Sequence, residues 1–290
     1  MTFMLAIFWL QWFEAFIAKC IILPYQYGLL TVGDPTKAYT SWWTDLESDM
    51  IPINYSDNII PLLVASHLLW HYIYSIMFGV VATGTERIFA TFYIHDYERK
   101  SRRYIPISLF IITHIITVPF AYCMTYNIFP YYIGFGTIIF LMALSLTVFL
   151  LVWKINFKLK NEMEKNLASR IFTLGEKFQI KENYRALLMA KRILIFAVCY
   201  APITSTCFTL VNFKIIGNNA AIFIHLMENS ISFNPLFTCP VLISCSSVWV
   251  NQFYKCCPIL HNILKKKNNA VKEKINETDI YFNQLKNAWI

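Results

Sequence analysis

Apolar residues along the chain gather in six long runs that polar connections separate. The runs cover about residues 4–30, 59–83, 105–127, 129–153, 192–213 and 219–249. A membrane-spanning helix needs about 20 mainly apolar residues, and each run reaches that length. The runs are continuous and do not alternate apolar with polar positions, which argues against the strands of a transmembrane barrel. The pattern therefore predicts six transmembrane helices within residues 1–250, followed by a polar tail over 251–290.

The composition leads to the same class of protein. Hydrophobic residues make up 57% of the chain and charged residues only 14%, whereas soluble domains carry about 25% charged residues. A mean hydropathy of +0.47 fits a chain that exposes apolar surface to lipid. The first residues have neither the basic segment nor the cleavage site of a secretory signal, so we interpret them as part of a retained helix. The expected fold is an all-α, polytopic membrane bundle.

The positions of lysine and arginine predict the orientation of the bundle. Of the 25 basic residues, 22 lie in three segments: the connection after the second run, the connection between the fourth and fifth runs, and the tail. Basic connections remain on the cytoplasmic side of a membrane. We therefore expect both termini in the cytoplasm. Because the charge follows the connections and forms no single patch, the expected partner is the lipid bilayer and not nucleic acid.

Two candidate modification sites lie in the connections. Asn54 begins an Asn-Tyr-Ser sequon in the first connection, which the orientation places outside the cell. Cys256 and Cys257 follow the last run beside basic residues, where cysteines can carry palmitate. An unused sequon and two unmodified thiols fit the same residues.

Glu86 and Arg87 stand side by side where the second apolar run turns basic. In one interpretation Arg87 extends to water and Glu86 lowers the cost of its charge. In the other, the pair holds helices together in one state and frees Arg87 for a cytoplasmic partner in another. From the residues alone, the first interpretation is favoured over the switch.

Polar residues within the runs are candidates for ligand binding. His225 and Glu228 lie three apart on the last run and share a helix face. They are candidates for a ligand pocket, although Glu228 paired with His225 or Asn229 is the simpler explanation. His67 and His71 have a spacing that suits a metal, but no third ligand is evident. We therefore expect no metal and no cofactor.

Asn234-Pro235 interrupts the last run with a residue that cannot complete a helical hydrogen bond. Such a proline kinks a membrane helix, and the asparagine can satisfy the freed backbone groups. The pair is a candidate hinge, and a purely structural kink is an equally good explanation.

Three stretches of the chain together resemble one protein family: TERIFATFYIHDYE (85–98), FQIKENYRALLMAKRILI (178–195) and Ser-Phe-Asn-Pro (232–235). They are similar to the nematode chemoreceptors of serpentine receptor class epsilon, which have a seven-helix, rhodopsin-like architecture. The resemblance implies a receptor that binds a small molecule in the outer half of the bundle. It also implies that Glu86 and Arg87 act as a switch toward a heterotrimeric G protein, and a location in the plasma membrane of a sensory cilium. The first run then matches the second family helix, so the chain is expected to be a shortened member.

Other functions have less support in the sequence. The motifs of common enzymes, such as a nucleophile elbow, HExxH or a phosphate-binding loop, do not occur, so we do not expect an enzyme. A transporter usually shows an internal repeat with matched broken helices, and the two halves of this chain are not similar. A transporter and a shortened membrane protein that does not signal remain the alternatives.

Overall fold

The computed structural model describes residues 2–34, 50–51, 58–94, 102, 104–164, 173–212, 215, 220–244, 250, 252–253 and 255. Within them the chain forms long helices and no strand, which confirms the predicted all-α class. The helices are α1 (Thr2–Gln26), α2 (Ile59–Phe92), α3 (Tyr104–Thr125), α4 (Tyr131–Glu164), α5 (Leu174–Asn212) and α6 (Ala220–Ser244).

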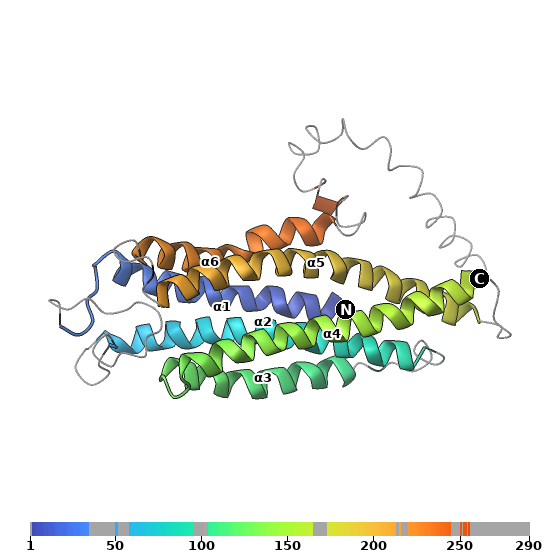
Figure 1. Ribbon diagram of the computed structural model, residues 1–290, viewed down its shortest axis with the longest axis horizontal. Coiled ribbons are helices and arrows are strands. Elements are labelled where there is room, and N and C mark those ends of the chain that lie inside the picture. The colour runs from blue at the N-terminus through green and yellow to red at the C-terminus, as the bar shows by residue number, and fades with distance from the viewer. Residues whose placement is uncertain are drawn as a thin grey trace. The chain divides into compact units, whose positions relative to one another are not determined.

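The chain divides into two compact units, Met1–Pro235 and Leu236–Ile290. The first unit holds α1 to α5 and the beginning of α6. Within it α2 is the central helix, because it packs against α1, α3, α4 and α5 (Figure 1). Side chains on different faces of α2 can therefore contact four other helices, and polar residues of α2 can join these helices to one another.

The polarity of the first unit is reversed relative to that of a soluble protein. Large apolar side chains of α3 and α4 are exposed, whereas polar side chains of several helices are buried. An exposed apolar surface of this extent is stable in lipid and not in water. Three of the described helices are long and apolar enough to cross a membrane: α2, α3 and residues Tyr132–Glu164 of α4. The count of six spans stays a prediction.

Two helices end in turns that their sequence specifies. After α1, Gly28 has φ of 70°, the amide of Leu29 donates to the carbonyl of Pro24, and that of Gly28 donates to Tyr25. After α3, Asn127 has φ of 52° and the amide of Ile128 donates to the carbonyl of Cys123. Both are Schellman motifs, in which glycine or asparagine adopts the left-handed conformation that other residues avoid.

Helices α4 and α5 continue well beyond the apolar runs. The runs end near residue 153 and begin again near 192, but α4 continues to Glu164 and α5 starts at Leu174. The extensions bury Met163 and Ile180 in a small apolar cluster with Ile94. At the start of α5 the side chains of Thr173 and Glu176 each bond the other's backbone amide, which is a capping box.

Gly84 sets how closely α2 approaches α4. A Cβ atom at Gly84 would lie 2.6 Å from Cγ1 of Val148, and the short, branched valine side chain has little freedom to move away. We expect Gly84→Ala to lower the free energy of unfolding by about 1–3 kcal/mol, the usual cost of overpacking. The melting temperature of the detergent-solubilised protein measures this loss.

The double variant Gly84→Ala/Val148→Ala removes the clash and is expected to recover much of the lost stability. As a control, alanine at Gly136 meets no atom within 4 Å and should leave the melting temperature nearly unchanged. Equal losses at Gly84 and Gly136 would contradict the close approach of the two helices.

Candidate functional site

Buried and half-buried polar side chains of different helices meet in three groups among the described residues of the first unit. We name each group by two of the helices that it joins. The α2–α5 cluster contains Glu86, Arg87, Thr91, Asn156 and Asn183. The α1–α3 network contains Gln11, Glu14, His71, Ser75, His114 and Thr117. The α1–α6 ion pair joins Lys19 to Glu228, and Gln26 forms hydrogen bonds with both.

In the α2–α5 cluster, Glu86 and Arg87 lie inside α2 and are 3% and 9% exposed. The Arg87 guanidinium forms an ion pair with Glu86, and its Nη1 donates to Oδ1 of Asn183 on α5 at 3.3 Å. A buried charge is costly unless it is paired and hydrogen-bonded. Because α2 continues to Phe92, this burial favours a contact that joins helices over an arginine that extends to water.

Helix α4 joins the same cluster through Asn156, which is fully buried. Its Nδ2 donates to Oγ1 of Thr91 at 2.9 Å, and the Thr91 hydroxyl donates to the carbonyl of Arg87 at 2.8 Å. Among the described residues, no hydrogen-bond partner reaches Nε of Arg87 or Nδ2 of Asn183. Since buried polar groups are normally satisfied, another arrangement of this cluster can gain hydrogen bonds.

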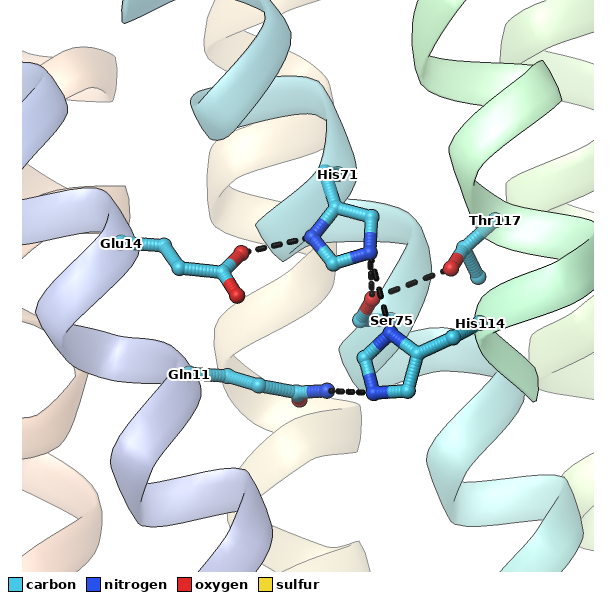
Figure 2. Close-up of polar contacts among 6 residues, drawn as sticks. All are labelled: Gln11, Glu14, His71, Ser75, His114 and Thr117. Atoms are coloured by element: carbon cyan, nitrogen blue, oxygen red, sulfur yellow. Dashed lines mark hydrogen bonds and ion pairs between the residues drawn. The ribbon is translucent and has the colours of Figure 1, made fainter. Parts of the chain in front are cut away.

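The α1–α3 network lies between three helices and is shown in Figure 2. Nδ1 of His71 is 2.6 Å from Oε2 of Glu14, and its Nε2 is 3.1 Å from Nδ1 of His114. The other nitrogen of His114 is 3.3 Å from Nε2 of Gln11. The two imidazole rings are stacked with their centroids 5.1 Å apart. Residues from α1, α2 and α3 therefore form one continuous polar chain.

The sequence pattern does not predict this network. It places His71 four residues from His67, a spacing that suits a metal, and it gives no link from His71 to Gln11, Glu14 or His114. Among the described residues, no three His, Cys, Asp or Glu side chains are placed to hold a metal ion. The sequence does contain a signal for the network: Glu14, His71 and His114 lie inside apolar runs, where ionisable residues usually pair with one another across helices.

In the structure Glu228 is paired with Lys19 and not with His225 or Asn229, the partners that the sequence suggested. Its Oε2 lies 3.2 Å from Nζ of Lys19 and also accepts a hydrogen bond from Gln26, so both partners come from α1. Glu228 is buried, whereas His225 is exposed. The two residues of the candidate ligand pocket are thus on one helix but in different surroundings.

Asn234 and Pro235 lie within α6, which stays helical through both residues. The boundary between the two compact units falls directly after Pro235. The remaining predicted sites, Asn54, Cys256 and Cys257, lie outside the described residues.

Comparison with known proteins identifies the family. The family model described as "Sre G protein-coupled chemoreceptor" matches residues 1–290. Serpentine receptor class epsilon-38 of Caenorhabditis elegans is 36% identical over 302 residues, which cover all of this chain and 83% of the relative. Serpentine receptor class epsilon-37 of the same organism is 34% identical over 299 residues, covering all of this chain and 82% of the relative. No solved structure matches. The chain belongs to the Sre family of G protein-coupled chemoreceptors, and it is an integral membrane protein with a chemoreceptor function.

Proposed function

We propose that the α2–α5 cluster is the coupling switch of this receptor and that ligand binds in the opposite, outer half of the bundle. The observation that carries the proposal is the buried contact of Arg87 with Glu86 on its own helix and Asn183 on α5. In this closed arrangement the guanidinium is not available to a partner. Separation of α2 from α5 exposes Arg87 to a heterotrimeric G protein.

The orientation in the membrane follows from the basic connections. They put the end of α2 at Phe92, the end of α4 and the start of α5 on the cytoplasmic side. The C-terminus is then cytoplasmic as well. Because the chain belongs to a chemoreceptor family, we propose that the receptor resides in the plasma membrane, in a sensory cilium. With this orientation the α2–α5 cluster lies at the inner end of the bundle, within reach of a cytoplasmic partner.

The same orientation puts the α1–α6 ion pair in the outer half. We propose that a small polar ligand competes for Lys19, Gln26 or Glu228, with exposed His225 at the edge of the site. A ligand that breaks this pair changes how α1 holds α6. The Asn234-Pro235 hinge lies further along α6, at the boundary between the compact units, and can transmit the change to the inner end.

The switch is tested without knowledge of the ligand. We expect Glu86→Gln to raise ligand-independent nucleotide exchange on a co-expressed G protein by about tenfold. Hydrogen bonds to charged groups contribute about 1.5–3 kcal/mol, and 1.4 kcal/mol corresponds to tenfold in the ratio of closed to open receptor. The measurement is GTPγS binding in membranes that contain equal amounts of each receptor.

A matched control changes an exposed acidic residue of α5. Glu182 is exposed, and its contact with Arg185 spans 3.9 Å, so Glu182→Gln should leave basal exchange unchanged. Unchanged exchange in Glu86→Gln, with normal membrane insertion, would refute the closed switch.

A further inference from the structure

We propose that the α1–α3 network is a proton-binding site that takes up one proton and then reverses the direction of its hydrogen bonds. This inference does not depend on the coupling role of Arg87. It rests on the hydrogen-bonding capacity of Gln11, Glu14, His71 and His114, and it makes acidity an input to the helix packing of this receptor.

The described network has one consistent set of donors and acceptors. The Gln11 amide can only donate through Nε2, so Nε2 of His114 accepts. His114 then carries its hydrogen on Nδ1 and donates it to Nε2 of His71. His71 in turn carries its hydrogen on Nδ1 and donates to the Glu14 carboxylate. Both imidazoles are neutral, and the network has a net charge of −1 from Glu14.

A second consistent set of bonds exists with one more proton. His71 then carries hydrogens on both nitrogens and donates to Glu14 and to Nδ1 of His114. His114 moves its own hydrogen to Nε2, which now needs an acceptor in place of the Gln11 donor. The added proton is the only atom gained, and no covalent bond between heavy atoms changes. The ionised pair of Glu14 and His71 leaves the network neutral.

The acceptor that this second state needs is already present. Oε1 of Gln11 is buried, and no donor among the described residues reaches it. Rotation of the Gln11 amide by half a turn brings Oε1 to the position that Nε2 occupies and satisfies the His114 hydrogen. A buried acceptor without a partner normally has an explanation, and here the protonated state supplies it.

Ser75 and Thr117 allow the change without loss of a bond. The Ser75 hydroxyl donates to Oγ1 of Thr117, and its oxygen lies 3.3 Å from Nε2 of His71. The oxygen can therefore share the new hydrogen on that nitrogen. Both states keep the bond from Ser75 to Thr117. The bond between the two rings and the bond between His114 and Gln11 reverse their direction.

Among the residues that the structure describes, few other charges act on this site. On α1, Lys19 is paired with Glu228 of α6, and on α2, His67 interacts electrostatically with His71 and Glu14. The charged side chains of α4 and α5 lie at residues 154–164 and 176–192, at the end of the bundle that contains the α2–α5 cluster. The positive charge on protonated His71 thus balances the negative charge of Glu14, and a network without net charge costs less to bury than an anionic one.

Solid-state NMR of the full chain in lipid bilayers, with ¹⁵N-labelled histidine, tests the proposal directly. Ring nitrogen shifts distinguish the two tautomers and the imidazolium. Labelled Trp or Thr carbonyl carbons identify His71 and His114 without a mutation, because Trp70-His71 and Thr113-His114 are unique pairs in the sequence. Between pH 8 and pH 5 we expect His114 to change from the Nδ1–H to the Nε2–H tautomer at the midpoint at which His71 becomes imidazolium.

Two variants add a quantitative check. Glu14→Gln keeps an acceptor for His71 but removes the charge, so its midpoint should fall by about one pH unit or more, a tenfold weaker proton affinity. Glu182→Gln makes the same chemical change at an exposed carboxylate of α5 outside the network and should keep the wild-type midpoint. A single His114 tautomer across the whole pH range would overturn the proposal, as would Glu14→Gln titrating like the wild type. If Glu14→Gln does not fold, the wild-type tautomers decide alone.

Discussion

Arg87→Ala is expected to abolish G protein activation while the receptor still inserts into the membrane. In the proposed open state the guanidinium is the group that α2 presents to the G protein, and alanine removes it. Combined with Glu86→Gln, whose expected exchange is high, Arg87→Ala should return GTPγS binding to the level of membranes that lack the receptor. Membrane extraction with carbonate measures insertion independently.

The substitution also removes the contact with Asn183, so loss of folding has to be separated from loss of coupling. Asn183→Ala removes the same hydrogen bond from the side of α5 and leaves Arg87 in place. If the bond only stabilises the bundle, both variants lose exchange equally. If Arg87 is the coupling group, Asn183→Ala keeps or increases exchange and Arg87→Ala eliminates it. Full exchange in Glu86→Gln/Arg87→Ala would refute the role given to Arg87.

Lys19→Glu is expected to leave most of the receptor molecules unfolded. It places a second carboxylate against buried Glu228, whose Oε2 lies 3.2 Å from Nζ of Lys19 in the native structure. Breaking a buried ion pair from one side costs about 3–5 kcal/mol, which is comparable to the whole stability of many domains. Size-exclusion chromatography of the detergent extract, with a fluorescent fusion, measures the yield of folded, monodisperse receptor.

The reciprocal exchange Lys19→Glu/Glu228→Lys restores one acidic and one basic partner and should recover a large part of the yield. The exposed pair Lys158–Glu162 on α4, at 3.8 Å, is the matched control, since its reversal should change stability by no more than about 0.5 kcal/mol. Failure of the double exchange to exceed either single variant would show that the two residues do not stabilise the bundle through each other.

The sequence alone determined which segments form helices and where several of them end. In lipid every backbone amide and carbonyl must be bonded within the segment, so a continuous apolar run has little choice but to be helical. Gly28 and Asn127 end their helices because their own side chains, or the lack of one, permit a left-handed conformation. The family, too, was evident from short stretches of residues.

Helix length at the basic end of the bundle was decided by tertiary structure. Hydropathy placed the ends of the fourth and fifth segments near 153 and 192, because charged residues begin and end there. The helices extend to Glu164 and from Leu174, since Met163 and Ile180 become buried only when the two extensions pack together with Ile94. A count of apolar residues cannot detect a contact that single apolar residues make within a mainly polar stretch.

The partners of the buried polar groups were also decided by the tertiary structure. Glu228 meets Lys19 across 209 positions of sequence, and His71 meets Glu14 across 57 and His114 across 43. Spacing along one helix identifies which residues share a face, as for His225 and Glu228, but it does not determine which neighbouring helix that face contacts. These residues pair because a polar or charged group that is buried without a partner is costly, and the packing of α1, α2, α3 and α6 determines which groups are buried together.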